Sequence, residues 1–238
     1  MWRLVSVVMP AYRLGDGIYD NVLRVCEFLN ELGYPYEVIV VDDGSDDDTY
    51  RKAMKAKLIN RSVVVLRHER NLGKGKAFIT GYRASKGDVV VLLDADLDIP
   101  PQQIGPLLEA LHDADIAITD KWHKESRVIT TRPRKAMSRG FNLAVRILTG
   151  LRLNDTQTGC KAFRRDVLED VIPKLKISGY AFDVELLWIA VRLGYSVVSV
   201  PACYPIRLVG EFCLKNAFKM FLDLLRITFR FRFRQALG

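Results

Sequence analysis

Short apolar runs alternate with amphipathic segments along the first half of the chain. Four of the runs are rich in β-branched residues and lie between polar turns, which is typical of strands buried on both faces: Arg3–Met9, Tyr36–Val41, Ser62–Leu66 and Val89–Leu93. Between them apolar residues recur at helical spacing: Ile18–Gly33, a helix that Asp48 or Thr49 opens and that ends near Ile59, and Gly73–Ser85. This alternation predicts a parallel sheet with helices on both faces.

The second half of the chain is less regular. Its apolar spacing predicts four helices: Gln102–Leu111, Lys135–Leu148, Asp166–Leu175 and Ala181–Leu193. Short strands are predicted at Ile116–Thr119, Ser196–Pro201 and Ala202–Arg207. Asp155–Phe163 is compatible with a strand or a loop, and the polar, basic segment 121–134 with a mobile loop. We therefore predict one α/β domain over residues 1–208, followed by a tail over residues 209–238.

The tail is predicted to form an amphipathic helix. Its apolar face carries Leu214, Phe218, Phe221, Leu222, Leu225 and Phe229. Its polar face carries Lys215, Asn216, Lys219, Asp223, Arg226 and Arg230. Such a helix commonly docks on the protein core. Because residues 229–234 also alternate phenylalanine with arginine, we favour the interface of an anionic membrane, to which basic residues are attracted.

The charge of the chain is positive and unevenly placed. The net charge is +8, and residues 211–238 and 124–139 are its two basic stretches. This predicts an anionic partner, either a nucleic acid or a membrane. The four cysteines are far apart and are predicted to be reduced thiols, and the three histidines show no zinc-ligand spacing. We find no signal peptide and no apolar run of the 18 or so residues that a membrane span needs.

Three aspartates directly follow the strand that ends at Leu93: Asp94, Asp96 and Asp98. Open α/β sheets bind ligands at the carboxyl ends of their strands. Alternating carboxylates suit Mg²⁺ or Mn²⁺, which complete their coordination with water and phosphate oxygens. An EF-hand calcium loop would need glycine and glutamate where Ile99 and Gly105 stand, so that type of site is excluded. A solvated acidic turn remains the alternative.

Two other polar groups are expected at the same edge, because parallel strands end on the same side. The segment 10–12 (Pro-Ala-Tyr) ends the first strand, and Asp42 and Asp43 end the second. Tyr12 can stack on a nucleobase, and an aspartate can accept hydrogen bonds from its N–H groups. Turn and helix-cap chemistry is the other interpretation of the two aspartates. Residues 71–76 open a helix with glycines and lysines, which is a weak indication of an anion site.

The motifs at 7–12 (VVMPAY), 40–45 (VVDDGS), 71–75 (NLGKG) and 94–96 (DAD), in this order, resemble family 2 glycosyltransferases. These have the GT-A fold, a Rossmann-like and mostly parallel sheet flanked by helices. The segments 134–140, 155–163 and 182–187 resemble the branch of dolichyl-phosphate mannose synthases and dolichyl-phosphate glucosyltransferases. The resemblance covers about residues 4–207.

The resemblance implies a role for each matching position. Residues for the nucleotide sugar would be Pro10, Ala11, Tyr12, Asp42, Asp43, Asn71, Lys74, Asp94 and Ala95. Mg²⁺ or Mn²⁺ would be held by Asp94, Asp96 and Asp98. The acceptor phosphate would be held by Lys121, Arg134, Ser138 and Arg207. Lys121 would replace an arginine, because this chain has Asp-Lys-Trp at 120–122 where such enzymes often have Gly-Ser-Arg. The catalytic residues would be Asp96, Asp155 and Asp183.

The implied reaction is an inverting transfer of a hexose, mannose favoured over glucose, from GDP-mannose or UDP-glucose to a polyprenyl or dolichyl phosphate. The metal neutralises the leaving diphosphate. A phosphate acceptor is already an anion near pH 7 and needs only a cationic clamp. The alternative acceptor, a sugar hydroxyl of a lipid-linked glycan or polysaccharide, needs a general base, for which Asp155, Asp183 and Glu185 are candidates.

The implied location is the cytoplasmic face of the cell membrane, where the product would serve protein glycosylation. The chain would be peripheral there, or anchored by segments beyond it, with no nucleic-acid partner. A third class of function is a module without enzymatic activity that binds nucleic acid or membrane through its basic charge alone. Metal-dependent nucleotide binding that is lost in Asp96→Ala would argue against that class.

Overall fold

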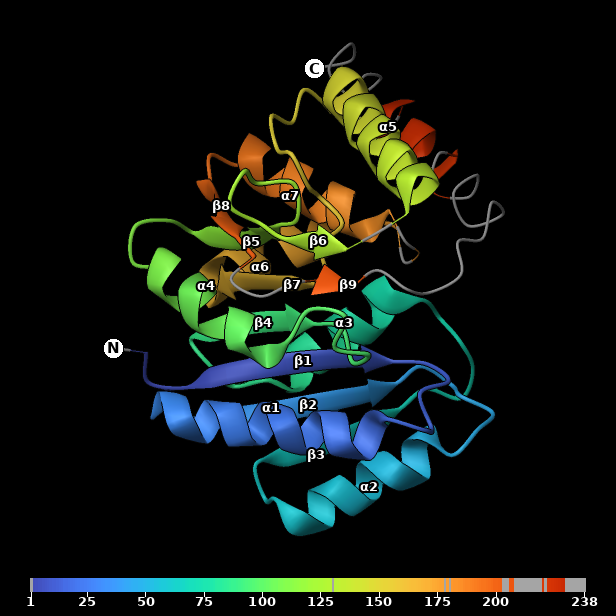
Figure 1. Cartoon of the computed structure of the whole chain (residues 1–238), viewed down its shortest axis with the longest axis vertical. Helices are drawn as coiled ribbons and strands as arrows, with labels where there is room; N and C mark the ends of the chain where they lie inside the picture. The colour runs from blue at the N-terminus through green and yellow to red at the C-terminus, as the bar shows by residue number, and fades with distance from the viewer. Residues whose placement is uncertain are drawn as a thin grey trace.

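The computed structural model describes residues 2–129, 131–177, 179, 181–202, 220 and 222–229, and the backbone of residues 206–207. Its described part contains a seven-stranded sheet (Figure 1), whose spatial order is β3 (Val63–Arg67), β2 (Tyr36–Asp42), β1 (Val5–Ala11), β4 (Val89–Leu93), β7 (Cys160–Arg164), β5 (Ile116–Asp120) and β8 (Val197–Pro201). Strand β7 is antiparallel to both β4 and β5, and the other neighbours are parallel. The predicted, mostly parallel α/β sheet is confirmed.

Helices cover both faces of the sheet because its strands alternate side chains between two apolar clusters. Val7 and Met9 of β1 point into one cluster and Val8 into the other. The first cluster packs against α1 (Ile18–Leu32), α2 (Thr49–Ile59) and α4 (Ile104–Ala110). The second packs against α3 (Lys74–Ala84), α6 (Arg165–Val171) and α7 (Phe182–Arg192). Figure 1 shows α1 in front of the sheet and α3 behind it.

The segment 121–134, predicted as a loop, contains regular structure. Strand β6 (Val128–Ile129) pairs in parallel with β9 (Ile206–Arg207). Within the described residues, β9 is the part of the predicted strand Ala202–Arg207 that forms. Helix α5 (Arg132–Thr149) then begins three residues earlier than its apolar spacing predicts, with a proline in its first turn. Proline is favoured there because the first helical N–H groups have no partner within the helix.

Helices α4 and α6 are also shorter than predicted, at ends that contain a proline. A 3₁₀ turn, Pro101–Gln103, precedes α4, and a second, Ile172–Lys174, follows α6. Proline lacks the N–H that continues an α-helix, so the regular helices are shorter than the apolar spacing suggests.

Most of the predicted tail, 209–238, lies outside the described residues. Met220 and residues 222–229 are described and helical. Leu224 and Ile227 are fully buried in the second apolar cluster, whereas Leu222 is 36% and Phe229 62% exposed. Leu222 and Phe229, two described members of the predicted apolar face, thus do not pack on the core, whereas Leu224 and Ile227 from outside that face do. Among the described helices, none is both long and apolar enough to cross a bilayer.

Candidate active site

Two neighbouring pockets open at the carboxyl ends of β1 and β4, and Asp94 and Asp96 line both of them. The smaller pocket has a volume of about 300 Å³ and the larger about 570 Å³. The predicted nucleotide-sugar residues that line the smaller pocket are Pro10, Ala11, Tyr12, Asp43, Asn71, Lys74, Asp94 and Ala95. The sheet therefore brings together segments that are far apart in the sequence, as the topology of parallel strands predicts.

Asp42 is the predicted nucleotide-sugar residue placed elsewhere. Its carboxylate is fully buried, lies 3.1 Å from Nε of Arg67, and accepts a hydrogen bond from the backbone N–H of Ser45 at 3.1 Å. Within the described part of the chain, Asp42 is not among the residues lining the smaller pocket. Its contact with a nucleobase stays a prediction.

Asp43 organises the loop that leads into α3. Its carboxylate accepts hydrogen bonds from the backbone N–H groups of Leu72 and Gly73 at 2.9 and 2.8 Å. It also contacts Nδ1 of His68 at 2.6 Å, while Nε2 of that imidazole contacts Oγ1 of Thr80 at 2.9 Å. Asp43 thus fixes the start of α3, which carries Lys74. Sequence reasoning missed His68 because a lone histidine gives no pattern.

Asp94 is held on two sides. Its Oδ1 lies 2.6 Å from Nζ of Lys74, and its backbone N–H donates to the carbonyl of Gly159 at 2.8 Å. A Cβ atom at position 159 would lie 2.5 Å from Oδ2 of Asp94, so only glycine leaves room for this carboxylate. Antiparallel β7 begins directly after that glycine, which is how the inserted strand helps to position Asp94.

Asp96 is exposed at the junction of the two pockets, and its Oδ1 accepts a hydrogen bond from the N–H of Asp98 at 3.1 Å. Partial desolvation of the carboxyl group by the surrounding pocket walls and the neighbouring negative charge of Asp94 raise the pKa of Asp96. Two such carboxylates fit Mg²⁺ or Mn²⁺, since these ions are commonly bound by one or two carboxylates together with water and phosphate oxygens. Within the described residues, no group of three or more His, Cys, Asp or Glu could hold a metal. Asp98 as a third metal ligand stays a prediction.

Lys74 belongs to a partly buried row of alternating charges. Besides Asp94, Nζ of Lys74 lies 3.8 Å from Oδ2 of Asp183. The other oxygen of Asp183, Oδ1, lies 2.7 Å from Nζ of the buried Lys161. Burial alone would lower the pKa of Lys74, but Asp94 and Asp183 outweigh it and the pKa is raised. Burial lowers the pKa of Lys161 despite its contact with Asp183. Asp183 is 4% exposed and, in the described part of the chain, lines neither pocket.

The larger pocket has a charged end and an apolar wall. Three residues predicted to hold a phosphate, Lys121, Arg134 and Ser138, line it together with Asp98. Partial desolvation in the pocket raises the pKa of Asp98, and the charges of Arg134 and Lys121 oppose that shift. The apolar wall consists of Ile99, Met137, Phe141, Ala144 and Met220. The side chain of Arg207, the fourth predicted phosphate ligand, lies outside the described residues.

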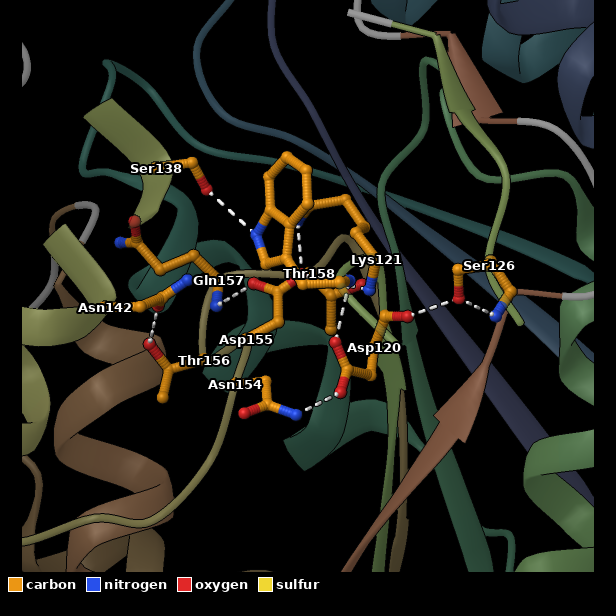
Figure 2. Close-up of polar contacts among 12 residues, drawn as sticks. Asp120, Lys121, Ser126, Ser138, Asn142, Asn154, Asp155, Thr156, Gln157 and Thr158 are labelled. Carbon is orange, nitrogen blue, oxygen red and sulfur yellow. Dashed lines mark hydrogen bonds and ion pairs between the residues drawn. The ribbon is translucent and has the colours of Figure 1, made fainter. Parts of the chain in front are cut away.

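Asp155, predicted to be catalytic, is paired with a cation. Its carboxylate is 1% exposed, lies 2.7 Å from Nζ of Lys121, and accepts a hydrogen bond from the N–H of Gln157 at 3.2 Å. Figure 2 shows Lys121 and Asp155 directed toward each other. Asp155 therefore holds the side chain of Lys121, a cation that lines the larger pocket.

The loop after β5 is fixed by contacts that sequence reasoning did not predict. The Asp120 carboxylate accepts hydrogen bonds from the N–H of Trp122 at 2.8 Å and from Nδ2 of Asn154 at 3.0 Å. The Ser126 hydroxyl donates to the Asp120 carbonyl at 2.6 Å and accepts from the N–H of Ala202 at 2.8 Å (Figure 2). The end of β5 is thus joined to the neighbouring segments on both sides.

A model of the family described as Glycosyl transferase family 2 matches residues 6–172. This chain belongs to glycosyl transferase family 2. The family predicted from the sequence is confirmed. A structure of glucosyl-3-phosphoglycerate synthase from Mycobacterium tuberculosis, in complex with Mn²⁺, UDP-glucose and phosphoglyceric acid, has a TM-score of 0.73. It is 23% identical and covers 95% of this chain and 80% of its own, which shows the GT-A fold.

Curated relatives lie in the predicted branch. The dolichol-phosphate mannosyltransferase of Pyrococcus furiosus is 35% identical over 232 residues, which is 95% of this chain but 63% of that protein. The dolichyl-phosphate β-glucosyltransferase of Dictyostelium discoideum is 28% identical, over 95% of this chain and 74% of its own. The undecaprenyl-phosphate mannosyltransferase of Micrococcus luteus is 35% identical, over 87% and 86%. This chain thus spans less than two thirds of the Pyrococcus furiosus relative.

Proposed function

We propose that this protein transfers a hexose from a nucleotide sugar to a polyprenyl phosphate, with inversion at the anomeric carbon. Mannose from GDP-mannose is the favoured donor sugar, and glucose from UDP-glucose is the other. The observation that carries the proposal is the larger pocket, which joins a cationic end to an apolar wall next to Asp94 and Asp96. The names of the relatives from Pyrococcus furiosus and Micrococcus luteus support the choice of acceptor.

The donor would occupy the smaller pocket. Tyr12 lines it and is 40% exposed, and although Cζ of Arg13 lies 5.3 Å from its ring centroid, the rest of the exposed ring would stack on a nucleobase. Lys74, at the start of α3, would attract the diphosphate. Asp94 and Asp96 would hold Mg²⁺ or Mn²⁺, which when bound neutralises charge on the leaving nucleoside diphosphate. The structural relative from Mycobacterium tuberculosis supports this cofactor, because its complexes hold Mn²⁺ or Mg²⁺ with UDP.

The acceptor would occupy the larger pocket with its phosphate at Lys121, Arg134 and Ser138. An anionic phosphate is recognised by charge-assisted hydrogen bonds from such groups. Its first isoprene units would lie along the apolar wall that Met137, Phe141 and Met220 help to form. A phosphate oxygen bound at this end would share the pocket with Asp94 and Asp96, and so would lie near the place expected for the anomeric carbon. Arg207 remains a predicted fourth ligand of the phosphate.

The contacts of the candidate general bases favour a phosphate over a sugar hydroxyl. Asp155 is paired with Lys121, and Asp183 with Lys161. Glu185 is fully buried and accepts hydrogen bonds from the N–H groups of residues 176 and 177 at 2.9 and 2.7 Å. Hydroxyl acceptors need a base within reach of the proton. Phosphate monoesters are already anionic near pH 7, so these carboxylates are better explained as positioning groups.

A membrane surface is the proposed site of action, on the cytoplasmic face. Leu143 and Ile147 are 56% and 68% exposed on the outer side of α5, where the exposed Arg139 and Arg146 accompany them. Exposed apolar residues flanked by basic ones fit the headgroup region of an anionic bilayer. Phe229, 62% exposed, adds to this character. Peripheral binding through these residues, with or without anchoring segments elsewhere, would bring the larger pocket to its lipid.

The proposal is tested by a donor and acceptor screen. Purified protein is incubated with Mn²⁺, either GDP-mannose or UDP-glucose, and a short prenyl phosphate such as citronellyl phosphate. Mass spectrometry should find a glycosylated prenyl phosphate with one of the two donors. If hexose passes only to saccharides, the hydroxyl-acceptor alternative is correct, and if no donor is consumed with any acceptor, the transferase proposal is wrong.

A further inference from the structure

Trp122, in the loop after β5, contacts Ser138, a predicted phosphate ligand that lines the larger pocket. Its indole Nε1–H donates a hydrogen bond to Oγ of Ser138 at 3.2 Å (Figure 2). A serine hydroxyl has one hydrogen to donate and accepts through its lone pairs. Because Trp122 occupies the accepting side, the Ser138 hydrogen is available for the anion in the pocket that Ser138 lines. We propose that Trp122 is a positioning residue that orients the Ser138 hydroxyl toward the acceptor phosphate; this rests on the proposed function.

The Trp122 ring also fixes the helix that carries Ser138. Nζ of Lys135 and Cζ of Arg139 lie 6.0 and 5.8 Å from the ring centroid. Residues 135, 138 and 139 are neighbours on one side of α5, so a single side chain touches two turns of the helix. Cations at this distance from an indole are attracted to its face. Together with the apolar contacts of Phe141 and Val145, the ring thus helps to set the rotation of α5 about its axis, and with it the direction of Ser138.

Helix α5 packs on the second apolar cluster through Phe141, Ala144, Val145 and Leu148 in its second half. None of residues 132–140, the part that carries Ser138, is buried, so this part depends on contacts such as those of Trp122. Ser138, Asn142 and Arg146, spaced four residues apart, form one polar row along the helix. Asn142 meets Thr156 and Arg146 meets Asn154, each at 3.4 Å, which is longer than the contact from Trp122 to Ser138. Of these three side-chain contacts, that of Trp122 is the one made to Ser138 itself.

Trp122 is itself held firmly enough to position another residue. Its backbone N–H donates to the fully buried carboxylate of Asp120, which also binds Asn154. Lys121, the preceding residue, is paired with Asp155. One loop thus carries both Lys121, as a direct cationic ligand, and the indole that places Ser138. The hydrogen bond between Trp122 and Ser138 thus joins the loop that carries Lys121 to the helix that carries Ser138.

The test compares Michaelis constants for the prenyl phosphate and for the nucleotide sugar in four proteins: wild type, Trp122→Phe, Ser138→Ala and the double variant. Phenylalanine keeps a ring beside α5 but has no N–H. We expect Trp122→Phe to raise KM for citronellyl phosphate about fivefold, the effect of one hydrogen bond, with KM for the donor unchanged. In the Ser138→Ala background the same substitution should change KM less than twofold, because the hydroxyl it orients is gone.

Trp2→Phe is the matched control. Trp2 also donates its indole N–H, to the carbonyl of Leu108 at 3.3 Å, and stacks on His112 away from both pockets. The control should change neither KM. If Trp122→Phe leaves the acceptor KM unchanged, raises both KM values equally, or acts additively with Ser138→Ala, the inference is wrong while the transferase proposal stands. If wild-type protein transfers no hexose to prenyl phosphate, the proposed function is wrong, and the role of Trp122 falls with it.

Discussion

Lys74 and Asp94 form an ion pair, 2.6 Å between Nζ and Oδ1, at the point where the two pockets meet. The lysine places a positive charge against a carboxylate that is expected to bind a divalent cation. A metal and Lys74 therefore compete for Asp94. When a nucleotide diphosphate is bound, its negative charge gives Lys74 a partner that can replace Asp94, so metal and nucleotide should bind cooperatively.

Replacing Lys74 tests this competition. Lys74→Met leaves the negative charges of Asp94 and Asp96 unopposed, so we expect Mn²⁺ to bind the nucleotide-free protein roughly tenfold more tightly. Electron paramagnetic resonance of free Mn²⁺ measures this affinity without any turnover. Lys76→Met, which removes an exposed lysine two residues away, should leave it unchanged. Equal or weaker Mn²⁺ binding in Lys74→Met would show that the ion pair does not oppose the metal.

Gly159→Ala should impair the reaction while leaving the fold intact. The new Cβ would lie 2.5 Å from Oδ2 and 2.9 Å from Cγ of Asp94, so that the carboxylate has to rotate away. Misplacement of a reacting group by about 1 Å typically costs on the order of 100-fold in rate, and we expect a loss of kcat/KM of that order. Because the displaced atoms belong to a side-chain end, thermal unfolding should shift by only a few degrees.

Gly105→Ala is the control for that substitution. Its Cβ would meet Cδ2 of Leu32 at 3.6 Å, an ordinary contact, on a helix away from the pockets. Wild-type kinetics are expected for it. A Gly159→Ala enzyme with the kcat/KM of wild type would mean that the observed position of Asp94 is unimportant for the reaction.

Asp155→Asn separates a positioning role from a general base. A base typically contributes 100-fold to 10,000-fold to the rate, so its loss would lower kcat by at least about 100-fold. We expect kcat to stay within about tenfold of wild type and the free energy of unfolding to fall by about 3 kcal/mol, because Lys121 is left as a buried, unpaired cation. Chemical denaturation and initial rates measure the two effects.

The double variant Lys121→Met/Asp155→Leu serves as the stability control. It removes both charges, and replacing a buried pair with apolar residues often restores stability. We expect it to unfold at a higher denaturant concentration than Asp155→Asn. A stable Asp155→Asn protein with no turnover, although it still binds the donor, would favour a sugar hydroxyl as the acceptor.

Asp115 gives a pH-dependent contribution to stability. Its carboxylate accepts hydrogen bonds from Oγ and N–H of Ser196 at 2.7 and 2.8 Å, joining the starts of β5 and β8. These bonds lower the pKa of Asp115. A folded-state pKa below the unfolded value of about 3.9 stabilises the protein above that pH, and the contribution is lost as pH falls through the folded pKa. Asp115→Asn should cost about 1 kcal/mol at neutral pH and progressively less in acid.

Denaturant unfolding of both proteins across this pH range measures the difference. A gap between wild type and Asp115→Asn that stays constant into strong acid would contradict the assignment. Asp113→Asn is a suitable control, because Asp113 is an exposed carboxylate on the same turn.

The sequence predicts the half of the site that depends on parallel strands. Apolar runs such as 89–93 are readable as buried strands, and parallel strands end at one edge, which places Asp94, Asp96 and the segment 10–12 together. The family motifs supplied Arg134 and Ser138, and Lys121 was predicted as a substitute for the family's arginine; the three residues do share one pocket. No periodicity was needed for Arg134 and Ser138, since both follow from a local motif.

The rest of the site depends on contacts between distant residues. Strand β7 is short, contains the buried Lys161 and runs antiparallel, so its polar flank 155–159 was compatible with a loop as much as a strand. The pairing of Asp43 with His68 and of Trp122 with Ser138 depends on how loops fold back on the sheet edge. Nothing in local spacing specifies such pairs. The tail shows the same limit, because its buried face depends on the surface it meets.

The central claim is that the acceptor's own phosphate attacks the sugar. It is tested most directly by offering the protein citronellyl phosphate and citronellol side by side, with Mn²⁺ and the donor that it uses, and by analysing products with mass spectrometry and NMR. We predict a hexosyl phosphate with inverted anomeric configuration from the phosphate and no product from the alcohol. Glycosylation of citronellol, or retention of configuration in the phosphate product, would contradict this account.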